Sequence, residues 1–438
     1  MEQPAAGGSA LGFQGDEVTT SAHVAVADDG GLFGWWNAGT PEGKRALIAA
    51  SLGWMLDSFD VMLYALVLAS LMSDLGISKD TAGALGSLTL IASAAGGMVF
   101  GVVADRFGRT RALMASVLLY SVFTAACGLA QTVTQLAVFR IFLGFGMGGE
   151  WASGAALVSE TWSDKHRGKA LGFMQSAWAI GYGAAALVTA AVLPVWGWRG
   201  VFFVGILPAF FTLWVRRNVE EPQIWRDMKR NPSATPGRFT DIFRGGLLRL
   251  TLAVTVMNAF TMFGWWGFNL WLPSYLRLPA SEGGVGLSTT AMSGFVFVMQ
   301  VGMWFGYVTF GFISDAVGRK RAYVFYTVVA AVLIFIYISI TAPIGLLLLG
   351  PFVAFFATGY FSGFGAVTAE IYPTDIRATA QGFTYNIGRV ASAVAPFAVG
   401  SLAQTDGFRA ALSLTSVAFL LAALTWIWIP ETKGRSLV

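Results

Sequence analysis

Twelve long apolar runs fill most of the chain, and short polar segments separate them. Each run can cross the roughly 30 Å hydrocarbon core of a bilayer as a helix, for which about 20 residues suffice. A helix pairs its own backbone groups, as lipid requires, and most of these runs lack the polar stripe of a helix on a soluble protein. The runs lie at 46–72, 84–104, 112–130, 135–157, 169–193, 200–215, 249–273, 287–313, 322–341, 344–366, 380–403 and 408–429. The pattern therefore predicts an all-α membrane protein with twelve transmembrane helices.

Composition and charge support this prediction. Hydrophobic residues make up 55% of the chain and charged residues 12%, whereas about a quarter of an average soluble domain is charged. With the N-terminus inside, the basic residues of the outer loops are only Lys79, Arg199, Arg277 and Arg409. Under the positive-inside rule we expect a multi-pass protein of a bacterial inner membrane, with both termini in the cytoplasm. The net charge of +4 then reflects topology and indicates no nucleic-acid partner.

A duplication is the most informative feature of the sequence. The segment that begins with Gly101 and ends with Arg109 recurs 210 residues later, and the same offset carries Glu160, Arg167 and Glu221 onto Glu370, Arg377 and Glu431. The chain is therefore expected to hold two parallel six-helix repeats that bind substrate between them near the middle of the membrane. The expected segments are a cytoplasmic tail (1–43), a first bundle (44–216), a cytoplasmic linker (217–248), a second bundle (249–429) and a cytoplasmic tail (430–438).

Polar residues that both halves share are candidates for scaffold and gate. They occur in the repeated loops and at the cytoplasmic ends of the fourth and tenth helices, where arginine can meet carbonyl groups and aspartate can meet a helix N-terminus. We interpret them as charge contacts that close the cytoplasmic side; the alternative is ordinary solvated loop charge. The candidates are Gly101, Asp105, Gly108, Arg109, Glu160 and Arg167 in the first half, and Gly311, Asp315, Arg319, Glu370 and Arg377 in the second.

Charges that only one half carries are candidates for proton and substrate binding, because a charge at the bilayer centre costs at least ~2.5–3.5 kcal/mol. Asp57 and Asp60 are three residues apart on the first helix and share one face. Two carboxylates so close disfavour double ionisation, so one of them could carry a proton near neutral pH. The alternative is a packing pair that hydroxyl and backbone groups satisfy.

Arg140 and Glu150 lie in the fourth helix. A counter-ion for Arg140 is expected, with Asp60 or Asp57 as the partner, and protonation of the aspartate would release the arginine. Glu150 is about 15 Å further along the helix, too far to reach Arg140, and is a second candidate proton site.

Arg389 lies in the middle of the eleventh helix. A guanidinium beside a central cavity suits a bidentate carboxylate, so we expect it to bind the substrate anion. The alternatives are contacts with backbone carbonyls and a pairing with an acid of the first half.

Amide and aromatic side chains within the spans are expected to shape the substrate pocket. Buried amides also bridge helices and tryptophans also mark membrane interfaces, so each residue alone is a weak indication. The candidates are Asn258, Trp265, Trp266, Gln175, Gln300 and Asn386. A nucleophilic triad, a metal cluster and a nucleotide loop are all missing from the sequence. We therefore expect neither an enzyme nor a metal or other cofactor.

Several of these segments resemble motifs of the major facilitator superfamily. The loop 101–109 is similar to its loop signature, and the run from Arg140 to Glu150 to the fourth-helix motif of its proton-coupled members. The chain end 430–435 resembles the close of the sugar-porter and organic-acid branches. Residues 56–60 resemble a first-helix motif of aromatic-acid and sialate–proton symporters, and 194–208 resembles the sialate group, which includes monocarboxylate carriers.

The resemblance implies proton symport of a carboxylate into the cytoplasm. It assigns Asp57 and Asp60 to the first-helix acids, Arg140 to the fourth-helix arginine and Arg389 to the eleventh-helix arginine of aromatic-acid carriers. Ser58 departs from the usual glycine. The linker is too short for the two extra helices of some sialate carriers, so a smaller acid is expected.

The sequence thus predicts a proton-coupled symporter with the major facilitator fold. It would import a small organic acid anion, of the monocarboxylate or aromatic acid class, by alternating access. The expected partners are the carboxylate, protons and the lipid bilayer, with the protein as a monomer. The alternatives are a proton-coupled sugar carrier, a drug or metabolite exporter or facilitator of the same fold, and a sensor that binds ligand without transport.

Overall fold

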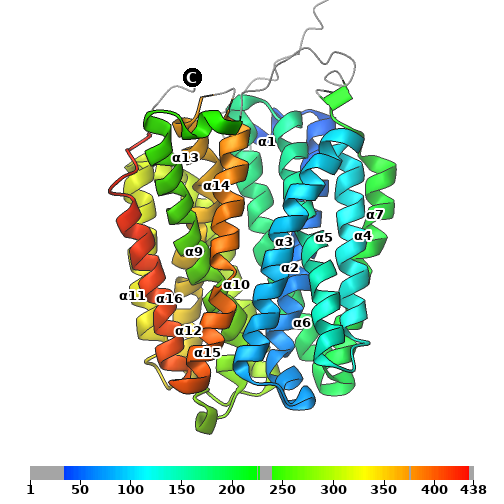
Figure 1. Ribbon diagram of the computed structural model, residues 1–438, viewed down its shortest axis with the longest axis vertical. Helices are drawn as coiled ribbons and strands as arrows, with labels where there is room; N and C mark the ends of the chain where they lie inside the picture. The colour runs from blue at the N-terminus through cyan, green and yellow to red at the C-terminus, as the bar shows by residue number, and fades with distance from the viewer. Residues whose placement is uncertain (1–33, 224, 227–238, 374–375, 434–438) are drawn as a thin grey trace, which may run out of the picture. The chain divides into compact units, whose positions relative to one another are not determined.

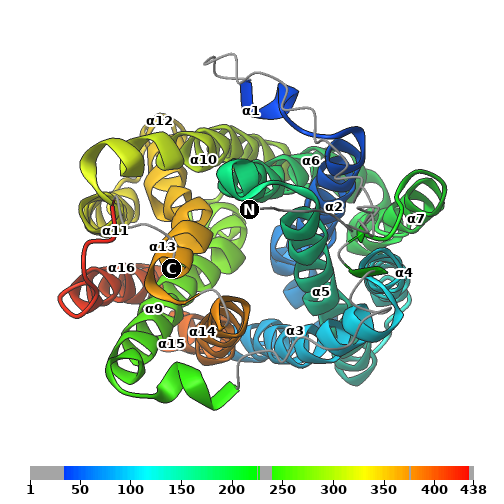
Figure 2. The same cartoon turned by 90° about the horizontal axis from the view of Figure 1, so that it is seen from above.

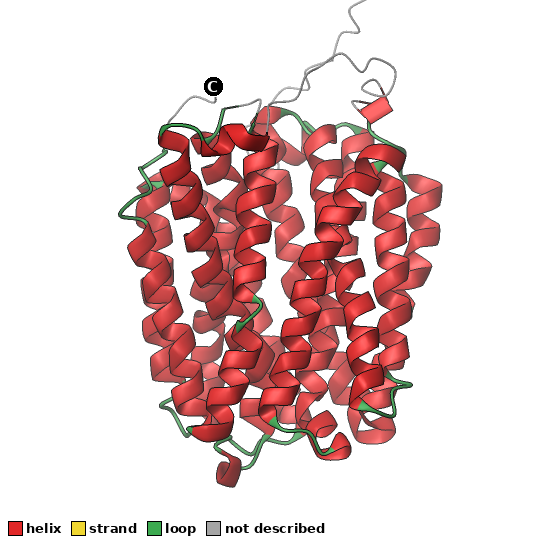
Figure 3. Ribbon diagram, viewed as in Figure 1, coloured by secondary structure: helices red, strands yellow, loops and turns green. Residues whose placement is uncertain are grey.

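The computed structural model describes residues 34–223, 225–226, 239–373 and 376–433, and divides the chain into two units, 1–39 and 40–438. The described part of the first unit contains α1 (Gly34–Asn37). The second unit contains all the other elements. Throughout the described residues the regular structure is helical (Figure 3). The structure therefore confirms the predicted all-α class.

The second unit consists of two successive groups of helices (Figure 1). The first group comprises α2 (Pro41–Leu75), α3 (Lys79–Phe107), α4 (Arg109–Cys127), α5 (Val133–Thr161), α6 (Asp164–Val204) and α7 (Leu207–Asn218). The second comprises η1 (Phe239–Phe243), α9 (Gly246–Arg277), η2 (Ala280–Glu282), α10 (Thr289–Val317), α11 (Arg319–Tyr337), α12 (Pro343–Thr358), η3 (Gly359–Gly363), α13 (Phe364–Ile371), α14 (Arg377–Ser392), α15 (Ala395–Thr405) and α16 (Gly407–Thr425).

Ten helical stretches in the described residues are long and apolar enough to cross a membrane. One of them, His166–Val215, contains two of the expected spans, and the backbone between these leaves the helical conformation at Gly197. The expected eleventh span is divided between α14 and α15. These two cases explain the difference from the twelve spans that the sequence predicts.

The repeated loops make the same turn in both halves. Gly108 joins α3 to α4 with φ +116°, and Gly318 joins α10 to α11 with φ +106°. L-residues with a side chain rarely adopt such values. Arg106, Arg109 and Arg111 lie at the first turn and Arg319 at the second, and we call this end of the bundle the basic end. The matching geometry confirms the repeat at the level of the backbone.

Glycines of α5 let this helix lie directly on α3. A Cβ atom built on Gly148 would lie 1.8 Å from the carbonyl oxygen of Ser93, and one on Gly144 would lie 2.2 Å from that of Thr89. Such approaches are typical of packing between membrane helices. The glycines of the fourth span therefore serve helix packing.

The two halves meet tightly at the end opposite to the basic end. A Cβ atom built on Gly83 of α3 would lie 2.4 Å from the carbonyl oxygen of Pro396 of α15. The backbone N–H of Phe397 donates to Ser87 Oγ at 3.2 Å, and that of Lys79 donates to Gln404 Oε1 at 3.1 Å. Seen along the helices, α3 lies beside α14 and α15 (Figure 2). These contacts hold that end closed.

The substitution Gly148→Ala tests the contact between α3 and α5. Because the added methyl group would overlap the Ser93 carbonyl, we expect a loss of about 1–3 kcal/mol in stability, measured as a lower midpoint of thermal unfolding in detergent. Gly101→Ala is the control, since a Cβ atom there has no neighbour within 4 Å in the described structure. Equal midpoints for both variants would contradict the packing account.

Candidate functional site

Asp57 and Asp60 are buried on α2, on one face of the helix. Within the described structure, both oxygens of Asp60 and Oδ2 of Asp57 have no hydrogen-bond partner. Ser58 between them donates from Oγ to the backbone carbonyl of Trp178 at 2.7 Å, which anchors α2 to α6. The hydroxyl of Ser58 is therefore committed to packing, and three of the four oxygens of the two buried carboxylates have no hydrogen-bond partner in the described structure.

Glu150 of α5 adds a third carboxylate to this region. It is fully buried, and neither of its oxygens has a hydrogen-bond partner among the described residues. A Cβ atom built on Gly53, one turn before Asp57 on α2, would lie 2.5 Å from Glu150 Oε1. Glu150 therefore packs against the helix that carries the aspartates and interacts electrostatically with Asp57. The glycine at position 53 leaves room for the carboxylate.

Tyr120 of α4 adds a buried hydroxyl to this acidic region. Its hydroxyl is buried, lacks a hydrogen-bond partner in the described part of the chain, and is in electrostatic contact with Asp57, Asp60 and Glu150. The sequence analysis missed Tyr120, because helix periodicity does not show which residue of a neighbouring helix faces a given position.

Arg389 of α14 reaches across to the first half. It is 3% exposed, and its Nη1 donates to Ser93 Oγ of α3 at 3.0 Å. Its Nη2 donates to the Tyr385 hydroxyl at 3.4 Å, and the guanidinium carbon lies 5.2 Å from the centre of the Tyr385 ring. These partners are uncharged. Arg389 also interacts electrostatically with Asp57 and Glu150, although no described carboxylate lies within 4.0 Å of it.

Arg140 does not pair with an aspartate in this conformation, so that expectation is wrong here. Its guanidinium carbon lies 3.5 Å from the centre of the Tyr64 ring, and its Nε donates to the Leu85 carbonyl at 3.3 Å. Tyr64 is one turn beyond Asp60 on the same face of α2. Its ring, and not an aspartate, contacts the guanidinium of Arg140. A desolvated contact between a cation and an aromatic face is worth about 2 kcal/mol and takes the place of the expected ion pair.

The predicted tryptophans of α9 lie where the halves meet. The rings of Trp265 and Trp266 contact the ring of Trp178 of α6, with centroids 5.7 and 6.2 Å apart. Trp178 also packs on Trp54 of α2 at 4.7 Å. The sequence analysis missed Trp54 and Trp178, although Trp54 is three residues before Asp57 and therefore shares its face.

The predicted amides lie on four helices around this region. Asn258 of α9 is fully buried and its amide has no hydrogen-bond partner in the described structure. The same holds for Oε1 of Gln175 on α6 and Oε1 of Gln300 on α10. Asn386 of α14 donates to the Gly382 carbonyl of its own helix at 2.9 Å. Three of the four amides thus keep free hydrogen-bonding capacity.

A second contact between the halves lies nearer the basic end. Trp151 follows Glu150 on α5, and its ring stacks on that of Tyr385 of α14 with centroids 4.2 Å apart and planes at 5°. Tyr385 in turn holds Arg389. Neither Trp151 nor Tyr385 was predicted, although Tyr385 lies one turn before Arg389.

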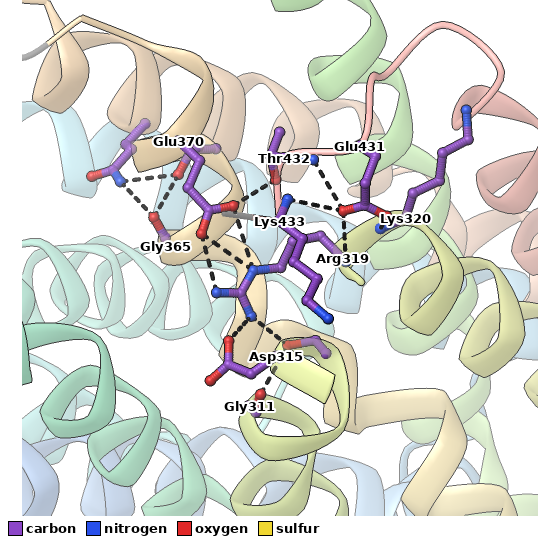
Figure 4. Close-up of polar contacts among 12 residues, drawn as sticks. Gly311, Asp315, Arg319, Lys320, Gly365, Glu370, Glu431, Thr432 and Lys433 are labelled. Atoms are coloured by element: carbon purple, nitrogen blue, oxygen red, sulfur yellow. Dashed lines mark hydrogen bonds and ion pairs between the residues drawn. The ribbon is translucent and has the colours of Figure 1, made fainter. Parts of the chain in front are cut away.

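The residues predicted as gates form one network in each half. Arg109 contacts Glu160 at 2.8 Å, and Arg319 contacts Glu370 at 3.1 Å and Asp315 at 2.5 Å (Figure 4). Both glutamates therefore bind the arginine of the repeated loop in their own half.

The remaining predicted gate residues are placed as follows. The side chain of Arg377 donates to the Tyr372 carbonyl at 3.3 Å. The backbone N–H of Arg167 donates to the Ser163 carbonyl at 2.8 Å. Gly101 and Gly311 have open space where a Cβ atom would lie. The side chain of Asp105 lies outside the described residues.

Glu221 and Glu431, which the repeat relates, cap the helices that follow the loops. Glu221 accepts from the backbone N–H groups of Thr110 and Arg111 at 3.1 and 3.2 Å. Glu431 accepts from those of Arg319 and Lys320 at 2.8 and 3.2 Å (Figure 4). Each carboxylate thus satisfies free donors at a helix N-terminus. Partial burial would raise the pKa of Glu431, but the backbone N–H groups of Lys433, Arg319, Thr432 and Lys320 hold the pKa below its usual value.

Known proteins identify the family of this chain. A family model described as Major Facilitator Superfamily matches residues 50–306 and 281–437. The chain belongs to the Major Facilitator Superfamily. It is therefore a membrane transporter and not an enzyme.

Several transporters are similar to this major facilitator protein over most of its length. A putative metabolite transport protein of Haemophilus influenzae is 36% identical and covers 90% of this chain and 98% of its own. A probable 4-methylmuconolactone transporter of Cupriavidus pinatubonensis is 33% identical, with coverages of 92% and 94%. The sialic acid transporter NanX of Escherichia coli is 32% identical, with coverages of 90% and 96%. These names match the organic-acid group that the sequence motifs resemble.

A solved structure supports the fold. The xylose transporter XylE from E. coli, in a partially occluded inward-open conformation, has a TM-score of 0.74 and covers 91% of this chain and 100% of its own. The identity is 20%, so the likeness concerns the fold alone. It agrees with the predicted major facilitator architecture.

The substitution Glu431→Gln tests the helix cap of this transporter. Loss of the charge should lower stability by about 1 kcal/mol at neutral pH, measured by thermal unfolding in detergent. Because the folded-state pKa of Glu431 is lowered, its contribution is present at neutral pH and is lost as the pH falls through that pKa. The difference in unfolding midpoint between wild type and variant should therefore disappear at acidic pH.

Glu220→Gln is the matched control, since the Glu220 side chain is 76% exposed and contacts only Arg226 at 3.3 Å among the ion pairs of the described residues. If Glu431→Gln lowers the unfolding midpoint at neutral pH no more than this control does, Glu431 does not have the capping role.

Proposed function

We propose that this transporter is a proton-coupled symporter that imports a small organic acid anion by alternating access. The observation that carries the proposal is Arg389: a buried guanidinium of the second half that faces the first half and has only uncharged partners within hydrogen-bonding distance. A carboxylate would bind it through paired charge-assisted hydrogen bonds. The substrate would thus lie between the halves.

The charges near Arg389 supply a reason for coupling to protons. Three carboxylates, Asp57, Asp60 and Glu150, and the guanidinium of Arg389 are buried in this region, and Arg389 interacts electrostatically with Asp57 and Glu150. An anionic substrate would add a further negative charge to this low-dielectric region, at a large cost in desolvation and repulsion. Uptake of a proton by one of the carboxylates offsets the added charge. Substrate and proton therefore favour each other's binding.

The orientation follows from the distribution of basic residues. We place the basic end, both termini and the linker 217–248 in the cytoplasm, and the protein in a bacterial inner membrane. The tight contact between α3 and α15 is then external, and its opening would admit substrate. The networks of Arg109 with Glu160 and of Arg319 with Glu370 would stiffen each half while the halves rock against each other.

The relatives support an organic acid as substrate. Two of them carry the names of a 4-methylmuconolactone transporter and a sialic acid transporter, and in both cases the identity is above 30% over at least nine tenths of this chain. A neutral sugar or a cationic drug would offer Arg389 no carboxylate to bind within hydrogen-bonding distance. The tryptophans at the interface of the halves and the free amides would contact the rest of the acid.

Proton coupling can be measured in lightly buffered proteoliposomes. Addition of a transported acid, from a set of lactate, benzoate, muconate and sialate, should make the external medium more alkaline with the wild-type protein. Asp57→Asn and Asp60→Asn should reduce this signal at least about tenfold while binding of the acid persists, because one proton-accepting carboxylate is lost. The exposed Glu282→Gln is the control and should behave as the wild type. If the wild-type protein catalyses counterflow of the acid but addition of the acid leaves the external pH unchanged, symport would be contradicted.

The role of Arg389 can be separated from that of the protons by counterflow, which needs no proton gradient. Arg389→Gln removes the charge, and since hydrogen bonds to charged groups contribute about 1.5–3 kcal/mol, the half-saturating concentration of the acid should rise about 10- to 100-fold. Arg389→Lys keeps the charge without the planar fork and should fall between. An unchanged half-saturating concentration in Arg389→Gln would show that the substrate binds elsewhere.

A further inference from the structure

We propose that the basic end of the second half carries a binding site for an anionic phospholipid of the adjacent leaflet, in the pocket between the end of α10, the start of α11 and the chain segment after α16. The pocket has a volume of about 1110 Å³. It lies away from Arg389 and the buried carboxylates, and the proposal does not depend on the transported substrate.

Three cations line the pocket: Lys320, Arg321 and Lys433. The Lys320 ammonium donates to the Ile429 carbonyl at 3.2 Å, and the Lys433 ammonium donates to the Ala316 carbonyl at 2.8 Å. Each ammonium group has three donors, so two remain on each. In the described part of the chain, none of the three cations lies within 4.0 Å of a carboxylate. Backbone carbonyls hold the two lysines in place, and all three cations keep their charge for a ligand.

The acidic groups nearby are already engaged. Glu431 lines the same pocket, but its carboxylate accepts from the backbone N–H groups of the two helix-starting residues and of its own segment (Figure 4). Asp315 contacts Arg319 at 2.5 Å. Among the described residues, neither carboxylate forms an ion pair with the side chain of a lining cation, and the pocket is lined by three positive charges and one negative charge. The pocket is therefore suited to a phosphate group.

The other lining residues distinguish a lipid from a free phosphate. Val317, Phe325 and Val328 line the pocket and are 47%, 57% and 36% exposed. Phe325 and Val328 lie on the face of α11 that continues through the exposed Val332 and Phe335 toward the middle of the span. This face is long and apolar and would contact lipid in a membrane protein. An acyl chain can lie along it while the headgroup phosphate meets the cations.

The first half lacks this arrangement, although the repeat gives it the same backbone. With the offset of 210 residues, Lys320 corresponds to Thr110 and Lys433 to Gln223. A pocket at the end of α3 has a volume of about 450 Å³ and contains one cation, Arg106. Basic loops orient both halves, but that general requirement does not explain why two additional lysines converge on the larger pocket. The asymmetry points to a ligand of the second half.

Native mass spectrometry of the delipidated protein tests the site. Phosphatidylglycerol should bind more tightly than phosphatidylcholine with the same acyl chains. The double variant Lys320→Gln/Lys433→Gln should weaken phosphatidylglycerol binding about fivefold for each lysine and leave phosphatidylcholine binding unchanged. The matched variant Arg106→Gln/Arg111→Gln in the first half should keep the wild-type affinity.

Two further arms distinguish the sources of phosphate and guard against misfolding. Because the acyl chain contributes to binding, glycerol 3-phosphate should not displace phosphatidylglycerol. For the same reason, Phe325→Ser should lower the affinity for phosphatidylglycerol. If the double variant does not fold, Arg321→Gln, which replaces an exposed side chain, tests whether phosphatidylglycerol binding depends on the positive charge of the pocket. Equal binding of the two lipids, an unchanged affinity in the folded lysine or Arg321 variants, or displacement by glycerol 3-phosphate would overturn the proposal.

Discussion

The structure depends on how it balances charge inside the membrane. Asp57, Asp60 and Glu150 come from the first half and Arg389 from the second, and all four are almost completely buried. Such groups are expensive in lipid unless they find partners. In this conformation the partners are only partly present, since the carboxylates have oxygens without hydrogen bonds in the described structure and Arg389 bonds hydroxyl groups. Under the proposed function, this site accepts a proton and an anion, which supply the missing partners.

Contacts within each half tie its helices and loops together around this site. The glycines of α5 bring it against α3, and the arginine–glutamate networks and glutamate caps tie the loops to the helix ends in both halves. All these contacts lie within a half, and the arginine–glutamate networks and the glutamate caps also follow the repeat. Contacts between the halves, such as Trp178 with Trp265 and Trp151 with Tyr385, do not follow it. The networks and caps within each half are thus related by the repeat, whereas the contacts between the halves, which would separate during transport, are not.

The sequence was sufficient for the features that depend on one helix or on the repeat. Hydrophobic length predicted the spans, except that α6 contains the non-helical Gly197 and the eleventh span is broken before α15. The offset of 210 residues indicated the glutamates that cap α4 and α11. Contacts across helices were harder, because helix period shows which face a residue occupies and not which neighbour meets it. For that reason Arg140 was assigned to an aspartate although it lies on Tyr64, and Tyr120, Trp54 and Trp178 were missed.

The most direct test of the central claim is calorimetric titration of the purified transporter with a transported acid, in two buffers of different ionisation enthalpy. The difference between the two heats gives the number of protons taken up for each anion bound. Coupling through the buried carboxylates predicts a net uptake of protons at neutral pH. With Arg389→Gln, acid concentrations that saturate the wild type should give little of this uptake, because that variant binds the anion about 10- to 100-fold more weakly. Equal heats in both buffers, with saturable binding of the acid, would contradict the account.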